Sequence, residues 1–297
     1  MVLPNFLIIG AAKAGTTSLY AYLKQHPDIY MSEVKEPRFF APEVFTNYNE
    51  VARNGARRVP FTFEEYQELF AGVTDETAIG EASTEYLYFP GVPARIKQSI
   101  PDIKLIAVLR NPVERAFSAY CYQLRDNCEP LSFEEALIAE ADRIKQGYRP
   151  GWHYQQPGFY SQQVKRYLDT FDRSQIKIYL QDDLVKDSVK VSQDIYKFLG
   201  VDDSFVPDIT RKNISGVPKN KFLHSIFTQD NPLKSLVKPL LPLKMRQNIY
   251  QKVRKNNLTS KPTLAGETRQ QLTELYRKDI EQLQEILSVD LSHWLNQ

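Results

Sequence analysis

The chain of 297 residues contains 42% hydrophobic, 12% aromatic and 25% charged side chains, a composition typical of folded globular proteins that excludes disordered, collagen-like and coiled-coil classes. Its net charge of +2 is unevenly distributed, because residues 211–261 hold 12 Lys and Arg against one Asp. This basic block indicates either a solvated face or a surface for a phosphorylated or acidic ligand. No run of about 18 apolar residues is present, so we expect no membrane-spanning helix.

Short apolar runs alternate with helical patterns along the chain. The elements predicted, in chain order, are a strand over 5–9, a helix over 16–25, a strand over 28–31, a helix over 62–70, strands over 77–81 and 103–109, a helix over 112–126, a helix capped by Ser132, a helix over 159–171, a strand over 176–180, and helices over 189–199 and 267–287. This alternation predicts one α/β domain over residues 1–297, with a mainly parallel, doubly wound sheet flanked by helices. Apolar residues are interleaved with the charges of the basic block, which we therefore place inside the same domain.

The strongest motif is the sequence GAAKAGTTS over residues 10–18, where the first strand turns into a helix. Exposed backbone N–H groups and the positive end of a helix favour phosphate or sulfate at such a turn. The glycine spacing matches the nucleotide-binding P-loop, but two threonines replace the Lys-Ser/Thr pair of a Walker A motif and a lysine stands inside the loop. The residues expected to hold the anion are Lys13, Ala14, Gly15, Thr16, Thr17 and Ser18.

A second candidate anion site is the sequence LRNPVERAFS over residues 109–118, at the end of a predicted strand. Arg110 at the strand end can form paired hydrogen bonds with a phosphate, and Ser118, two turns along the next helix, can add its hydroxyl. Arg115 is expected to form a structural ion pair. Ligands of open α/β sheets bind at the carboxyl ends of the strands, so two such sites on neighbouring strands indicate one ligand with two separated anionic groups.

Both motifs resemble those of sulfotransferases that use 3′-phosphoadenosine 5′-phosphosulfate (PAPS). Residues 13–17 are similar to the 5′-phosphosulfate loop of that family, and residues 109–118 are similar to its 3′-phosphate motif. In detail the chain looks more like the bacterial and heparan-sulfate sulfotransferases than like the cytosolic phenol and steroid class. The resemblance implies a P-loop NTPase-like fold, PAPS as the sulfuryl donor, PAP as the product, and no metal.

The resemblance also implies catalytic roles. The sequence KEPRFF over residues 35–40 is similar to the loop that carries the catalytic glutamate in that branch, which maps to Glu36. Pro37 is expected to hold Glu36 in an extended conformation. Lys13 would stabilise the leaving phosphate oxygen while Glu36 takes the proton of the acceptor. The further cofactor-binding residues implied, beside a stretch similar to the late cofactor-closing loop of bacterial members, are Lys212 and Gly216.

Other side chains are candidates to assist Glu36. Glu81 and Glu85 lie in the stretch GEASTEY, and His153 is a further candidate base, each with a structural role as the alternative. Ala82 stands where the glycosaminoglycan enzymes carry a lysine, which argues against a sulfated-glycan acceptor. The acceptor is by default an alcohol, with an amine or a phenol as alternatives. It could be a small molecule, a glycan or a group on a carrier protein, and nucleic acid is not expected.

Two other functions compete with sulfuryl transfer. A P-loop kinase or NTPase is the main alternative, because the strand predicted over 176–180 is followed by Asp182 and Asp183, which could form a metal-binding Walker B motif. Thr16 in place of the P-loop lysine argues against it. A non-catalytic adaptor or membrane-surface protein that uses the basic block is the other alternative.

The compartment is also constrained by sequence. The amino-terminal stretch lacks a basic region and a cleavage site, so it is interpreted as the first strand and not as a signal peptide. The two cysteines, Cys121 and Cys128, are expected as reduced thiols. Together these features predict a cytoplasmic protein, whereas the oligomeric state is not indicated.

Overall fold

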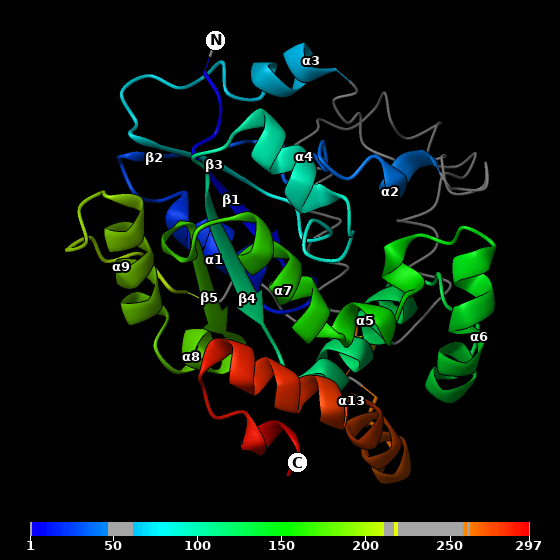
Figure 1. Cartoon of the computed structure of the whole chain (residues 1–297). Coiled ribbons are helices and arrows are strands. Elements are labelled where there is room, and N and C mark those ends of the chain that lie inside the picture. Colours follow the sequence, from blue (N-terminus) through cyan, green and yellow to red (C-terminus); the bar gives the residue numbers. More distant parts are fainter. Residues whose placement is uncertain (1, 47–61, 211–216, 219–257, 260–261, 297) are drawn as a thin grey trace.

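The computed structural model describes residues 2–46, 62–210, 217–218, 258–259 and 262–296. Within them a parallel sheet carries its strands in the order β2-β3-β1-β4-β5 (Figure 1). These strands are β1 (Phe6–Gly10), β2 (Ile29–Met31), β3 (Ala78–Ala82), β4 (Lys104–Leu109) and β5 (Ile176–Leu180). The predicted mainly parallel α/β sheet is confirmed.

The central strands are buried on both faces. Every residue of β1 and β3 is buried, as expected for parallel strands covered by helices on each side. Phe6 pairs with Gly80, and a side chain at Gly80 would collide with the Phe6 ring. Glu81 is fully buried within β3, which is an unusual position for a carboxyl group. The carboxyl end of β3 is therefore polar inside a largely apolar core.

Helices cover the two faces of the sheet. α1 and α9 contact each other on one face, whereas α7 contacts both α4 and α13 on the other (Figure 1). The chain moves from β1 to β2 in one direction along the sheet and from β3 to β4 in the opposite direction, so right-handed connections place their helices on opposite faces. The predicted doubly wound arrangement is confirmed. These helices are α1 (Thr16–Leu23), α4 (Val92–Ser99), α7 (Tyr160–Thr170), α9 (Ser188–Leu199) and α13 (Gly266–Leu287).

The remaining described elements are shorter or lie at the edges. They are α2 (Glu43–Thr46), α3 (Phe63–Glu68), α5 (Pro112–Arg125), α6 (Phe133–Lys145), α8 (Gln181–Lys186), and β6 (Val217–Pro218) paired antiparallel with β7 (Leu258–Thr259). Predicted elements agree with the structure within two residues at each end, but α2, α4 and α8 were not predicted. α4 is preceded by Gly91, which offers no capping side chain. Among the described residues, no helix is both long and apolar enough to cross a membrane.

The helix α13 is joined to α7 by buried polar contacts. The Asp279 carboxylate accepts hydrogen bonds from the backbone N–H groups of Tyr160 (2.7 Å) and Ser161 (3.1 Å), which begin α7. The Tyr276 hydroxyl donates to the carbonyl of Gln155 (2.8 Å). Because the first N–H groups of a helix have no intrahelical partner, Asp279 caps α7 from another helix.

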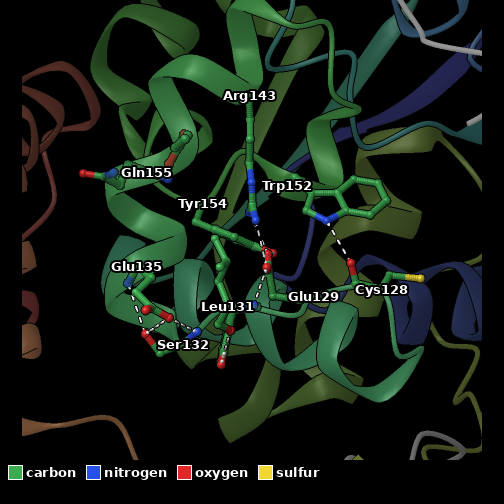
Figure 2. Close-up of polar contacts among 11 residues, drawn as sticks. Cys128, Glu129, Leu131, Ser132, Glu135, Arg143, Trp152, Tyr154 and Gln155 are labelled. Carbon is green, nitrogen blue, oxygen red and sulfur yellow. Dashed lines mark hydrogen bonds and ion pairs between the residues drawn. The ribbon is translucent and has the colours of Figure 1, made fainter.

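A buried ion pair holds α6 against the segment that precedes it (Figure 2). The Arg143 guanidinium donates two hydrogen bonds to the Glu129 carboxylate (2.6 and 2.8 Å), and the Tyr154 hydroxyl donates a third (2.6 Å). Burial raises the pKa of Glu129, but these donors outweigh it and the net shift is downward. At the start of α6, Ser132 and Glu135 form the predicted capping box.

Candidate anion-binding and active site

The turn between β1 and α1 leaves the first N–H groups of the helix to a ligand. Gly15 precedes α1 with a φ of 96°, a conformation that favours glycine, and no described side chain caps the helix there. The positive end of the helix dipole points at the same place. At the other end of the turn, a Cβ on Gly10 would lie 2.7 Å from that of Leu87. This geometry fits a phosphate or sulfate, as the sequence predicted.

The residues of this turn differ in accessibility. Lys13 and Ser18 are half-buried, Ala14 and Thr16 are buried, and Thr17 is exposed. Lys13 has a φ of 71°, which is rare for a residue with a side chain. Its ammonium lies 4.0 Å from the centre of the Tyr122 ring, on α5. Nothing in the sequence pattern predicted that Tyr122 would accompany Lys13.

The second predicted anion residue, Arg110, is in direct contact with the first site. Its Nη1 donates to the backbone carbonyl of Lys13 (3.1 Å), and its Nη2 lies 3.4 Å from a Glu114 carboxylate oxygen. Arg110 is 18% exposed, and burial lowers the pKa of its guanidinium. Asn111 begins α5 by accepting hydrogen bonds from backbone N–H groups of its first turn, and Ser118 is half-buried on the same helix. β1 and β4 are neighbours in the sheet, so the two candidate anion sites adjoin.

The candidate base Glu36 lies in a left-handed conformation with a φ of 62°, and not in the extended conformation predicted from Pro37. Two hydrogen bonds fix it: the Glu36 N–H donates to the Ala82 carbonyl (2.9 Å), and the Thr84 N–H donates to the Glu36 carboxylate (3.0 Å). These contacts to the end of β3 outweigh the local preference of a residue before proline. Lys35 Nζ lies 2.8 Å from the same carboxylate.

A second glutamate, Glu85, shares the partners of Glu36. Arg38 Nη2 lies 2.8 Å from Glu85 Oε1 and 3.8 Å from Glu36 Oε2. The Thr84 hydroxyl lies 3.1–3.2 Å from both Glu36 oxygens and 3.4 Å from Glu85 Oε2. The structure therefore brings together residues that are about 48 positions apart in the sequence.

The two carboxyl groups differ in proton affinity. Burial and the negative charge of Glu36 raise the pKa of Glu85 to about 7. Burial also acts to raise the pKa of Glu36, but Lys35, the hydrogen bond from Glu85 and Arg38 together lower it. Of the two carboxyl groups, Glu85 therefore has the higher proton affinity.

The other candidate bases have structural contacts. Burial raises the pKa of Glu81 to about 8, and its carboxyl accepts a hydrogen bond from Ser83 (2.9 Å). His153 has Nδ1 3.1 Å from the Tyr88 hydroxyl and Nε2 2.9 Å from the Tyr148 carbonyl. Burial lowers the pKa of His153 to about 4, which keeps the ring neutral at pH 7. Neither group contacts Glu36 through a described hydrogen bond.

Two further predictions concern residues outside the anion sites. Arg115 is buried and donates to the backbone carbonyl of Tyr154, so within the described residues its structural contact is a hydrogen bond and not the predicted ion pair. Lys212 and Gly216, expected to hold the cofactor, lie outside the described residues.

The carboxylate that suggested a kinase has a different role. Asp182 lies in the first turn of α8, where Oδ2 accepts a hydrogen bond from the Trp294 indole (3.1 Å) and lies 3.2 Å from His293 Nε2. It therefore anchors the buried Trp294 near the carboxyl end of the chain. Among the described residues, no cluster of three or more His, Cys, Asp or Glu could hold a metal ion.

The parallel sheet with helices on both faces, and the two candidate anion sites that adjoin at the ends of β1 and β4, define a doubly wound α/β protein. The chain matches the Sulfotransferase family over residues 4–205, and it belongs to that family. Its similarity to PAPS-dependent sulfotransferases is thereby confirmed, and the kinase alternative is not favoured.

Curated relatives share part of the chain. It is 31% identical over 205 residues to human bifunctional heparan sulfate N-deacetylase/N-sulfotransferase 3, covering 67% of this chain and 22% of that protein. It is 36% identical over 151 residues to membrane-associated sulfotransferase kil1 of Dictyostelium discoideum, covering 49% of this chain and 30% of that protein. The chain thus spans less than a third of the length of these relatives.

Solved structures extend the similarity to the whole chain. A sulfotransferase from Alicyclobacillus acidocaldarius is 36% identical, with a TM-score of 0.78 and coverage of 99% of both chains. Mouse sulfotransferase SULT7A1, solved with PAP, is 16% identical, with a TM-score of 0.50 and coverage of 93% of this chain and 84% of that chain. The latter similarity concerns the fold alone.

Proposed function

We propose that the protein transfers the sulfuryl group of PAPS to an acceptor hydroxyl, with an amine as the alternative acceptor. The observation that carries this proposal is the hydrogen bond from Arg110 to the Lys13 carbonyl, which joins the two anion sites at the ends of β1 and β4. A ligand with anionic groups at two separate positions suits such a pair of sites better than a ligand with one.

The residues present fit PAPS. When bound, PAPS supplies an activated sulfuryl group on its 5′-phosphate. The uncapped start of α1 and the Lys13 ammonium would hold this phosphosulfate, and Arg110 with Ser118 would hold the 3′-phosphate. Lys13 would also stabilise the negative charge that grows on the leaving phosphate oxygen. We propose Lys212 and Gly216 as further contacts to the cofactor. This is supported by β6, which follows them directly in the sequence and lies against α5.

Glu36 is proposed as the general base. It is 20% exposed, and the contacts from Lys35 and Thr84 fix its position at the carboxyl end of β3, beside the strand that leads into the anion loop. A carboxylate fixed in place can take the acceptor proton without a loss of side-chain entropy during the reaction. The left-handed backbone at Glu36 is the kind of strain that is retained at functional sites.

The acceptor is proposed to be a small molecule or a glycan, and the alternative is a group carried by a carrier protein. A cavity of about 360 Å³ lies near the two segments that carry Glu36 and Glu85, since Glu43 and Tyr88 both line it. Its other walls combine aromatic rings with glutamine amides, which suit a hydroxylated ring. We propose that this cavity receives part of the acceptor.

The whole chain, residues 1–297, is proposed to form one sulfotransferase domain. Support comes from α13, beyond the matched residues 4–205, which caps α7 through Asp279. A reducing compartment such as the cytoplasm is proposed from Cys121 and Cys128, which are thiols and not a disulfide.

A labelled-donor experiment tests the function. The protein is incubated with ³⁵S-labelled PAPS, or with γ-³²P-labelled ATP and Mg²⁺, and with glucose, glucosamine, phenol or a primary alcohol. We expect transfer of ³⁵S to an acceptor, and strong loss of this transfer in Lys13→Ala. Transfer of ³²P from ATP without any transfer of ³⁵S would contradict the proposal.

A further inference from the structure

The carboxyl groups of Glu36 and Glu85 form a connected pair at the end of β3. They interact electrostatically, since the negative charge of Glu36 raises the pKa of Glu85. Their side chains are 20% and 14% exposed, so each is largely shielded from water. Arg38 contacts both carboxyl groups, and the Thr84 hydroxyl lies within 3.4 Å of both. A proton can therefore pass between the two glutamates without passing through solvent.

Glu36 is well placed to take a proton but poorly suited to keep it. Lys35 Nζ and the Thr84 N–H both stabilise its ionised form. Among the described residues, the cation that contacts Glu85 is Arg38, and the ionised form of Glu85 is disfavoured by burial and by the charge of Glu36. The pair thus combines a carboxylate of low proton affinity, Glu36, with one of higher proton affinity, Glu85.

We propose that Glu85 is the positioning residue that finally holds the proton of the reaction, which Glu36 takes from the acceptor and passes on. The proposal rests on the proposed function, in which Glu36 is the base. At the start both carboxyl groups are ionised, and Lys35 with Arg38 neutralises the two charges. The acceptor O–H bond breaks as its oxygen bonds to sulfur, and the bond from sulfur to the leaving phosphate oxygen breaks. The electron pair leaves with PAP and the proton ends on Glu85.

The charged and polar groups around Glu36 and Glu85 are consistent with the pair taking up one proton. The cations are Lys35 and Arg38, on the loop before α2, and the described carboxyl group nearest in sequence is Glu81, inside β3. Glu81 is itself protonated at neutral pH, since burial raises its pKa to about 8. The other polar groups around these carboxyls are Tyr66 on α3, Ser83, Thr84 and Tyr86. In the described part of the chain, two cations therefore face Glu36 and Glu85, beside a Glu81 that is protonated at neutral pH.

The pH dependence of turnover tests the proposal in Glu85→Gln. The Gln amide can still accept from Arg38 and donate to Glu36, so it imitates permanently protonated Glu85. Single-turnover hydrolysis of PAPS, with water as the acceptor, is measured from pH 5 to 9. In the wild type we expect the rate to fall as the pH drops through about 7, because Glu85 then holds a proton beforehand. In Glu85→Gln we expect this fall to vanish and the rate at pH 8 to drop roughly 100-fold.

Three further variants complete the test. Glu85→Asp retains a titrating carboxyl, so a fall near neutral pH should return. Glu129→Gln removes a buried carboxylate from another arginine pair (Figure 2) and should keep the wild-type pH dependence. A Glu85→Gln rate that is reduced but still falls through pH 7, or that is unchanged at pH 8, overturns the proposal. Full turnover in Glu36→Gln would instead refute the base itself, and PAP binding measured in parallel tests the PAPS site separately.

Discussion

The side chain of Lys13 packs against an aromatic ring, and its backbone is held by Arg110. Its ammonium lies over the Tyr122 ring, 4.0 Å from the ring centre, and its carbonyl accepts from Arg110. An aromatic ring helps to fix the position of a cation without neutralising its charge. An ammonium fixed at this turn can interact with a ligand phosphate at the start of α1.

We expect Lys13→Ala to reduce turnover more than PAP affinity. The interaction of the ammonium with the leaving oxygen strengthens as charge develops, so its loss affects the transition state most. Turnover under chemistry-limited conditions and the Kd for PAP are the two measurements. Tyr122→Phe, which keeps the ring, is the matched control and should retain both. A weaker Kd with unchanged turnover would show that Lys13 only binds the cofactor.

For Glu36→Gln we expect a loss of turnover of roughly 10² to 10⁴, with PAP affinity nearly unchanged. The Gln side chain keeps the shape and still accepts from Thr84, but it cannot take a proton. The structural alternative is that Glu36 only neutralises Lys35, which it contacts at 2.8 Å. A variant that retains more than a tenth of the wild-type turnover would favour that alternative.

Sequence patterns predicted the candidate site residues better than the side chains that contact them in the fold. Glycine and lysine spacing was enough to predict the turn before α1, because that motif is local. The pair of Glu36 and Glu85 could not be predicted, since α2 and α3 intervene in the chain, and Thr84 reaches the Glu36 carboxylate only because β3 pairs with β2. Tyr122 likewise reaches Lys13 from another element.

Among the elements, strands and long helices followed their apolar periodicity, whereas three short helices, α2, α4 and α8, were not predicted. The apolar strand β5 is followed by acidic residues, which suggested a metal site. In the structure these residues begin α8, which follows β5 directly, and Asp182 there contacts Trp294. α2 has only one turn, and α4 starts without a capping side chain. Such helices depend on packing and not on local signals.

The cap that α13 provides to α7 predicts a stability effect. Asp279→Ala would leave the buried N–H groups of Tyr160 and Ser161 without their partner, at a cost of about 1–3 kcal/mol in the free energy of unfolding. Urea denaturation measures this difference. Asp142→Ala, at a 74% exposed side chain on α6, is the control and should change stability by less than about 0.5 kcal/mol. Equal effects of the two substitutions would argue against the cap.

Across the whole molecule, the charge distribution separates the basic block from the rest of the chain. Residues 1–210 hold 23 Lys and Arg against 29 Asp and Glu, whereas residues 211–261 hold 12 against one. Most of this block lies outside the described residues, but β6 within it contacts α5, the helix that carries Ser118. This contact is consistent with a role of the block beside the cofactor.

We expect PAP to protect the basic block from trypsin. Ligand contacts with the block would stabilise it by mass action, so cleavage within residues 211–261 should slow as PAP saturates the protein. Mass spectrometry of the fragments measures the rate at each site. Cleavage after Lys145, whose side chain is 78% exposed on α6, should not change. Identical fragment patterns with and without saturating PAP would show that the basic block does not contact the cofactor.

The most direct test of the account is the affinity of the protein for PAP compared with AMP, measured by calorimetry without divalent ions. PAP carries the 3′-phosphate that Arg110 and Ser118 are proposed to hold, and AMP lacks it. A charge-assisted hydrogen bond to a buried group contributes about 1.5–3 kcal/mol, so we expect PAP to bind at least tenfold more tightly than AMP. Arg110→Ala should remove most of this preference. Equal affinities for PAP and AMP in the wild type would contradict the assignment of the two anion sites to one PAPS molecule.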